Sequence, residues 1–147
     1  MKQDIYTFTK GDNDLVFTFF SIGKRGVIPK IVVFEYIKPN TYNLAFGDFD
    51  ISTDTFNDEI VSNNGDVKKV LATVVAILLH FFVIQPIAKV YIKGSNTIRT
   101  NLYQRIIKTY AAEYNDFLKI EGFLEGKLNS ELLDLSKNYS QFSITKI

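Results

Sequence analysis

The fold is decided by one stretch, "DLVFTFFSIGKRGVIPKIVVFEYIKPNTYNLAFG" (residues 14–47). It contains three segments that are rich in β-branched and aromatic residues, and such segments are typical of β-strands: 14–22, 29–37 and 41–47. The glycines of "GKRG" suit a hairpin turn between the first two segments, and "KPN" makes the next turn. Three consecutive strands joined by short turns predict an antiparallel meander.

Beyond this meander the chain alternates between helical and extended patterns. An almost uninterrupted apolar run predicts a buried helix over residues 67–84, with Asp66 as its N-cap and Pro86 as its stop. The later segments are, in order, a strand (88–93), a second helix (97–115), a strand (117–123), a short helix or loop (129–137) and a closing strand (140–147). We therefore expect one α+β domain, residues 1–147, with a single mainly antiparallel sheet of about five to six strands and two helices packed on one face.

Composition narrows the class of protein. A chain of 147 residues suits one domain, and the absence of cysteine excludes disulfides, thiolate nucleophiles and cysteine-ligated zinc. A net charge of +1 provides no global field that would attract nucleic acid or a membrane.

The apolar run at 70–84 is shorter than the roughly 20 residues of a membrane span. The N-terminal segment "MKQDIYTFTK" lacks the apolar core of a signal peptide, so we expect a cytoplasmic protein without membrane contact.

Charge is sorted along the sequence. Between Asp48 and Asp66 there are six acidic residues and no basic one, whereas between Val67 and Ala112 there are seven basic residues and no acidic one. Two interpretations remain open: the acidic loop folds over the basic elements and neutralises them, or the basic elements form a separate face that binds an anion.

Arg99 is the residue that most needs an explanation. Helical spacing places it near the centre of the apolar face of the 97–115 helix, in the first turn, where the helix dipole disfavours a cation. Removal of one partner from a buried ion pair costs about 3–5 kcal/mol, so we expect an anion beside Arg99. The internal alternatives for a structural bridge are Asp48, Asp50, Asp66 and Glu35.

The external alternative is a bound phosphate or carboxylate at the helix N-terminus. Free backbone amides and the side chains of the stretch "KGSNTIRT" would hold it, and Gly94 would allow a ligand to approach the backbone closely. The candidate binding residues are Lys93, Ser95, Thr97, Arg99 and Thr100.

A second candidate surface is the open face of the sheet. Tyr91, Lys89 and Lys30 are candidate contacts there, because aromatic and basic side chains on a sheet are typical of proteins that bind single-stranded nucleic acid. The alternative is that tyrosine covers the sheet edge and that lysine keeps it soluble.

Four motifs together resemble a known family. "GSNTIRTNLY", "FSIGKRG", "YNLAFGD" and "NNGDVKKVLATV" make the chain similar, over about residues 6–123, to a family of small uncharacterised bacterial proteins. The resemblance implies no established activity and therefore no catalytic residue.

These observations favour a binding module over an enzyme. Its ligand would be single-stranded nucleic acid or another phosphate-bearing molecule, and we expect no cofactor and no metal. The alternative is a protein-interaction or regulatory subunit, which would form a homodimer through the sheet edge or the acidic loop. A hydrolase or transferase that uses carboxylates of the 48–66 loop, with Arg99 as electrophile, has the least support, because no general acid–base pair is evident.

Overall fold

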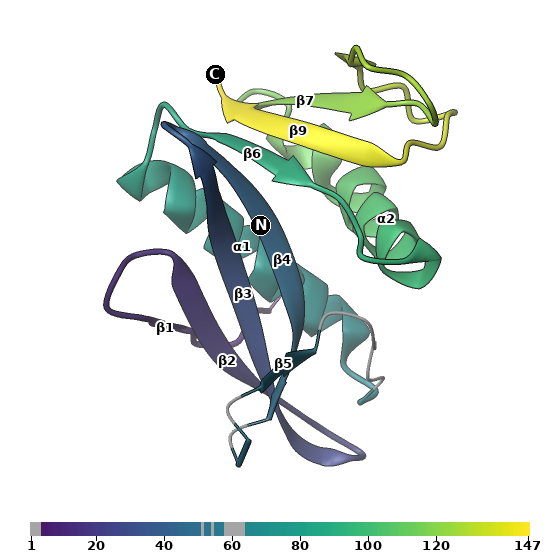
Figure 1. Ribbon diagram of the computed structural model, residues 1–147. Helices are drawn as coiled ribbons and strands as arrows, with labels where there is room; N and C mark the ends of the chain where they lie inside the picture. Colours follow the sequence, from purple (N-terminus) through teal and green to yellow (C-terminus); the bar gives the residue numbers. More distant parts are fainter. Residues whose placement is uncertain (1–3, 51, 54, 58–63) are drawn as a thin grey trace.

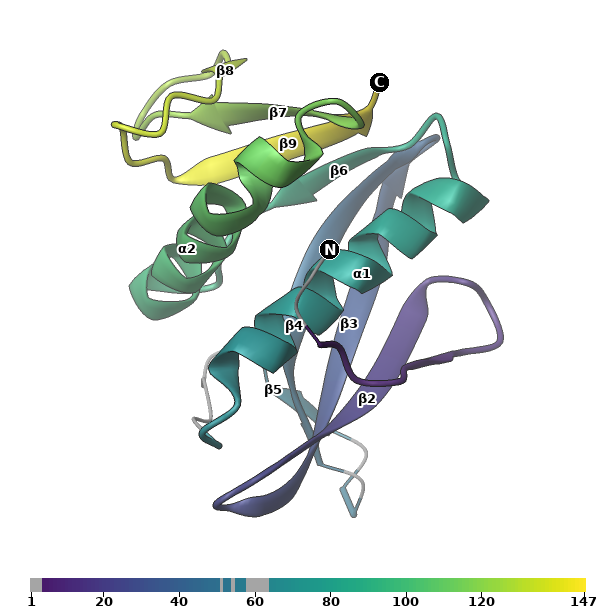
Figure 2. The ribbon, with the colours of Figure 1, turned by 180° about the vertical axis from the view of Figure 1, so that it is seen from behind.

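One mixed sheet carries two helices on one of its faces, in a computed structural model that describes residues 4–50, 52, 53, 55–57 and 64–147. Figures 1 and 2 show the sheet from its open side and from the side of the helices. The predicted α+β class and the placement of both helices on one face are confirmed.

The sheet is larger than predicted. Within the described residues it has nine strands: β1 (Thr9–Lys10), β2 (Val16–Gly23), β3 (Gly26–Lys38), β4 (Thr41–Asp50), β5 (Thr55–Asn57), β6 (Lys89–Ile92), β7 (Leu118–Phe123), β8 (Glu131–Leu132) and β9 (Gln141–Lys146). Their order is β1-β2-β3-β4-β6-β9-β7-β8, and β5 pairs with β4 alone. The estimate of five to six strands was too low because β1, β5 and β8 are too short to leave a periodic pattern.

The segment predicted as a short helix or loop also contains a strand. Within 129–137, Glu131 and Leu132 pair with Gly122 and Glu121 as β8, and turns follow them. The helical alternative for this segment was therefore wrong.

The meander forms as its turns predict. Gly23 and Gly26 pair with each other and leave Lys24 and Arg25 as a two-residue turn between β2 and β3. Gly26 has a φ of 88°, a conformation that glycine adopts without strain. Asn40 makes the turn between β3 and β4 with a φ of 60°, which asparagine tolerates better than most residues.

A parallel pair joins the two halves of the sheet. β4 and β6 run parallel, from Thr41 beside Lys89 to Leu44 beside Ile92, whereas all other strand pairs in the described residues are antiparallel. Parallel neighbours require a crossover connection, which the helix between them provides. The middle of β4 contacts the first turns of the second helix, where the Phe46 ring lies against Arg99 and the Phe46 amide donates to the Tyr103 hydroxyl.

The two helices are α1 (Val67–Ile84) and α2 (Thr97–Tyr114). Within the described residues, α1 is the one helix that is long and apolar enough to cross a membrane. In this fold it packs into the core: Phe81 is fully buried, and its ring stacks on Phe34 with 3.9 Å between centroids. The prediction of a buried core helix over residues 67–84 is therefore confirmed.

Asp66 stands at the predicted N-cap position, but its carboxylate does not cap α1. It accepts hydrogen bonds from the Tyr6 hydroxyl at 2.5 Å and from the Ser21 hydroxyl at 2.6 Å. Burial, together with the hydrogen bond to Asp66, raises the pKa of Tyr6 above its ordinary value. Asp66 thus ties the N-terminal segment and β2 to the start of α1.

Asp66→Ala should lower the free energy of unfolding by about 2 kcal/mol, because hydrogen bonds to a charged group contribute about 1.5–3 kcal/mol each. This exceeds the roughly 1 kcal/mol expected from the loss of a helix cap alone. Urea denaturation of this variant and of Tyr6→Phe measures the effect, and Tyr6→Phe should show a part of the same loss. The matched control is Asp116→Ala, which removes an exposed aspartate next to the other helix. Equal midpoints for the two aspartate variants would contradict the proposed role of Asp66.

Candidate functional site

The loop before α2 is held by its own hydrogen bonds. Asn96 is the N-cap: its side chain accepts a hydrogen bond from the Arg99 amide at 2.9 Å. Its carbonyl accepts from the amide and the hydroxyl of Thr100, both at 3.0 Å. A Cβ on Gly94 would lie 2.2 Å from the Thr100 nitrogen. The close approach that was predicted for a ligand at Gly94 is therefore made by the first turn of α2.

Arg99 points into the protein, as its position on the apolar face predicts. The residue is only 1% exposed, although it carries a full positive charge. Its guanidinium carbon lies 5.2 Å from the centre of the Phe46 ring and 5.5 Å from that of Tyr103. Both distances are typical of cation–π contacts. An Arg99 nitrogen also donates to the Tyr103 hydroxyl at 3.5 Å, and this hydroxyl accepts from the Phe46 amide at 2.9 Å.

Each of the four carboxylates considered as internal partners of Arg99 bonds at least one other group, and both Asp48 and Arg99 take part in further interactions. Asp48 forms an ion pair with Lys30, and Asp66 accepts from Tyr6 and Ser21. Glu35 accepts from Asn43 at 3.1 Å, and Asp50 accepts from Ser52 at 2.7 Å. Three further acidic residues of the 48–66 loop lie outside the described residues: Asp54, Asp58 and Glu59.

A polar groove runs along the outer side of the N-terminal half of α2, and we call it the α2 groove. Its volume is about 460 Å³. It is lined by Lys93, Asn96, Thr97, Thr100, Asn101, Gln104, Glu125, Asn138, Tyr139 and Ser140. Of the five candidate anion-binding residues, the groove thus brings together Lys93, Thr97 and Thr100. Ser95 and Arg99 do not line it, and Arg99 faces the core instead.

Hydrogen bonds fix the far wall of the α2 groove. The side-chain oxygen of Asn138 accepts from the side-chain amide of Gln104 at 3.1 Å and from the Lys108 ammonium at 2.9 Å. The Tyr139 backbone amide donates to Gln104 at 2.5 Å. These contacts join α2 to the segment before β9, so the groove has walls from two elements that are distant in sequence. Sequence periodicity carries no signal for this contact.

The three residues predicted on the open face of the sheet do not all lie there. Lys89 and Tyr91 lie on the open face of β6, where the Lys89 ammonium is 5.7 Å from the centre of the Tyr91 ring. Lys30 is 3% exposed and pairs with Asp48. Because it shares the strand alternation of buried Val32, it points to the helix side of the sheet. Its predicted place on the open face was wrong.

Sequence reasoning missed Asn64, a buried polar residue that lies against the β2–β3 turn. Its side chain accepts from the Arg25 amide at 2.5 Å and donates to the Gly26 carbonyl at 2.9 Å. A Cβ on Gly23 would lie 1.9 Å from the backbone carbonyl oxygen of Asn64, so only glycine fits there. The "NNGD" and "GKRG" motifs are therefore two parts of one structural unit.

A family model, described as a family of unknown function (DUF6934), matches residues 2–147. The chain belongs to the DUF6934 family. No curated protein and no solved structure matches the chain. The predicted resemblance to an uncharacterised family without established activity is thereby confirmed.

In this DUF6934 protein the motifs that carry the resemblance meet in pairs. "FSIGKRG" contacts "NNGD" through Asn64, and "YNLAFGD" contacts "GSNTIRTNLY" where Phe46 meets Arg99 and Tyr103. The first pair holds the segment before α1 against the β2–β3 turn, and the second holds β4 against the first turns of α2. Among the described residues there is no cluster of three or more side chains that would hold a metal ion.

Proposed function

We propose that this protein is a binding module without catalytic activity whose ligand carries a phosphate and lies in the α2 groove. The observation that supports this proposal is the meeting of Lys93, Thr97 and Thr100 in one groove with uncharged donors from Asn101 and Gln104. The groove also lies at the N-terminus of an 18-residue helix, where the dipole favours negative charge.

The charge of the groove limits the class of ligand. Lys93 is the basic residue of the lining, and Glu125 is the acidic one. One cation opposite one anion does not suit a polyphosphate. The hydroxyls and carboxamides favour a molecule with a single phosphate and a neutral polar remainder, such as a nucleoside monophosphate or one nucleotide of a single strand.

Phosphate should stabilise the protein through this groove. We expect inorganic phosphate, and more strongly a nucleoside monophosphate, to raise the midpoint of thermal unfolding above that in chloride of equal ionic strength. Saturation at 100 times the dissociation constant adds about 2.7 kcal/mol. Lys93→Gln should abolish most of this gain, whereas Lys38→Gln, which changes an exposed lysine distant from α2, should retain it.

A short single-stranded oligonucleotide, added in the same assay, separates the two ligand classes. Binding that weakens steeply with salt would make nucleic acid the ligand, because each phosphate contact releases counterions. Binding of the monophosphate alone would restrict the site to small molecules. The proposal fails if phosphate and chloride give the same midpoint for the unmodified protein.

A protein-interaction subunit is the second candidate function, and a different surface supports it. Phe20, Ile22 and Val27 are exposed on the β2–β3 hairpin, where Ile22 and Val27 are directly paired. Neighbouring exposed apolar side chains are typical of protein interfaces. A sedimentation mass of twice the 16.8 kDa of the chain would support self-association through such a surface.

A further inference from the structure

Large apolar side chains are exposed at one end of the molecule, and we call this end the apolar tip. β3 turns into β4 there (Figure 1), and both helices end there (Figure 2). Its residues, all more than half exposed, are Tyr36, Ile37, Val83, Ile87 and Phe117. Single exposed apolar residues are common on protein surfaces, but a group of them marks a site of contact with a protein or a membrane.

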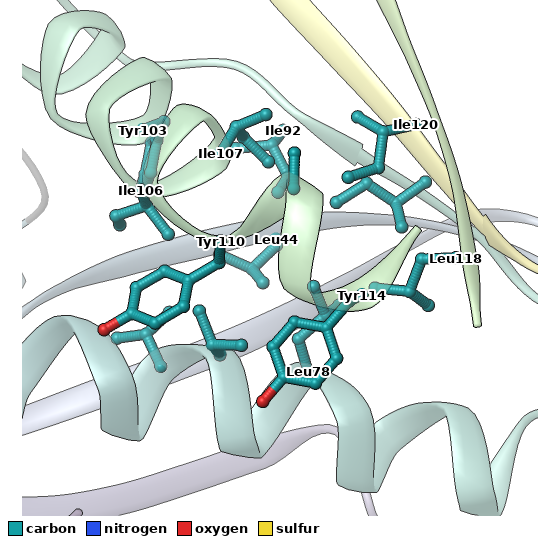
Figure 3. Close-up of a pocket in the computed structure, with 14 residues that line it drawn as sticks. Leu44, Leu78, Ile92, Tyr103, Ile106, Ile107, Tyr110, Tyr114, Leu118 and Ile120 are labelled. Atoms are coloured by element: carbon teal, nitrogen blue, oxygen red, sulfur yellow. The ribbon is translucent and has the colours of Figure 1, made fainter. Parts of the chain in front are cut away.

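The fold holds two of these side chains outward. Phe117 lies in the turn between α2 and β7, and the residues that flank this turn, Tyr114 and Leu118, both line the apolar pocket in the core (Figure 3). The Phe117 amide donates to the Tyr114 carbonyl at 3.0 Å. Ile87 is fixed in a similar way, because the next residue, Ala88, is buried. These buried neighbours leave Phe117 61% exposed and Ile87 73% exposed.

A row of lysine and threonine residues crosses the sheet beside the apolar tip, and we call it the lysine row. In the strand register Lys38 pairs with Thr41, Thr41 with Lys89, Lys89 with Thr145, and Thr145 with Lys119. Neighbouring strands are about 4.8 Å apart, so successive lysines of the row lie about 10 Å from each other. The pairing of distant strands thus brings together lysines that are scattered in the sequence.

The carboxylates around the lysine row do not neutralise it. Within the described part of the chain, Lys38 and Lys89 form no ion pair with a carboxylate. Lys119 lies 3.6 Å from Glu121 in an exposed and therefore weak pair. Glu121 and Glu35 stand in the next row, further from the apolar tip, and each accepts a hydrogen bond from an uncharged side chain. The lysine row therefore presents positive charge next to exposed apolar side chains.

We propose that the apolar tip and the lysine row together dock this protein on an anionic lipid surface. The apolar side chains lie below the head groups, and the lysine ammonium groups lie among the phosphates. Apolar side chains flanked by lysine are typical of segments that lie in a membrane interface, where the long lysine side chain keeps its charge in the head-group layer.

The charge of this end decides between the possible occupants. Lysine is depleted in protein–protein interfaces, so the lysine row disfavours a protein partner. A nucleic acid would contact the lysines but would leave Val83 and Ile87 without a role. The expectation of no membrane contact rested on the short apolar run and the low net charge. Peripheral docking requires neither, because a local cluster of lysines acts on anionic lipid within about one Debye length.

This surface is separate from the proposed phosphate site. The α2 groove includes Lys93, beyond the end of β6, whereas Lys89 begins this strand at the opposite end. The first turns of α2 form the groove, and its last turn leads to Phe117 at the apolar tip. The two sites can therefore be tested independently.

Co-sedimentation with vesicles tests the proposal, with phosphatidylcholine vesicles that contain about one third phosphatidylserine and with pure phosphatidylcholine as the reference. We expect binding to the anionic vesicles that weakens as salt is raised, because the Debye length shortens, and much weaker binding to the neutral ones. Lys38→Gln should weaken binding about fivefold, the effect of one lysine near an anionic surface. Lys127→Gln, which changes an exposed lysine beyond the far end of β7, should not. Asp116→Asn should strengthen binding, because it removes an exposed negative charge beside Phe117.

A single tryptophan reports which surface enters the lipid, because the chain contains none. Phe117→Trp should show blue-shifted emission with anionic vesicles, whereas Phe20→Trp, in the exposed hairpin of β2 and β3, should not. Ile87→Ser should weaken vesicle binding severalfold, and Leu128→Ser, which changes an exposed leucine after β7, should leave it unchanged.

Three outcomes would overturn the proposal. The first is equal binding to the anionic and the neutral vesicles. The second is a shift of emission in Phe20→Trp alone, which would move the contact to the hairpin. The third is binding of a single-stranded oligonucleotide that requires Lys38 while no vesicle binds, which would make nucleic acid the partner of the lysine row.

Discussion

Arg99→Leu should lower the free energy of unfolding by about 3 kcal/mol. The guanidinium contacts the rings of Phe46 and Tyr103 in the core, and a desolvated cation–π contact contributes about 2 kcal/mol or more. Leucine restores a part of the packing but neither of these contacts. Urea denaturation measures the loss.

The control for this substitution is on the same helix. Arg105 is exposed, so Arg105→Leu should change stability by no more than about 0.5 kcal/mol. The same curves with and without phosphate test whether Arg99 has a role in ligand binding. Because Arg99 is buried away from the α2 groove, any phosphate-dependent gain should persist in Arg99→Leu. A neutral substitution that abolishes the phosphate effect would instead place the anion at Arg99.

Asn64→Ala should also cost about 3 kcal/mol. The side chain of Asn64 is 1% exposed and bonds the backbone of the β2–β3 turn through the Arg25 amide and the Gly26 carbonyl. Alanine leaves both groups without these bonds, and each buried polar group without a partner costs about 1–3 kcal/mol. Hydrogen exchange should show faster exchange of the Arg25 amide, since this amide loses its side-chain acceptor.

The matched control is Asn101→Ala, which removes an exposed asparagine from α2 and should change stability by less than about 0.5 kcal/mol. A loss below about 1 kcal/mol for Asn64→Ala would mean that water replaces its hydrogen bonds.

The predictable part of the fold is the part in which periodicity and burial coincide. Val90 and Ile92 are buried while the alternating residues Lys89 and Tyr91 are partly exposed, so alternation alone found β6. It could not find the direction in which β6 pairs with β4, because parallel and antiparallel strands share this pattern. The same alternation, applied to Lys30 beside Val32, would have placed that lysine on the helix side.

The candidate site was less predictable for a physical reason. Helical spacing identified Arg99 as buried, and the predicted start of the second helix at residue 97 is confirmed. The α2 groove, however, depends on Asn138, which reaches Gln104 from the far end of the chain. Asp66 was a plausible cap in sequence, but hydroxyls from Tyr6 and Ser21 compete for its carboxylate in the folded protein. Contacts between distant segments leave no local pattern.

The parallel pair of β4 and β6 has a kinetic consequence. β2, β3 and β4 are neighbours in both sequence and space, so they can assemble with short loop closures. Thr41 meets Lys89 only after the chain between them has been closed into a long loop, and β9 and β7 attach to the sheet beyond β6. Docking of β6 should therefore be the slow step of folding, and its four residue pairs control the assembly of every later strand.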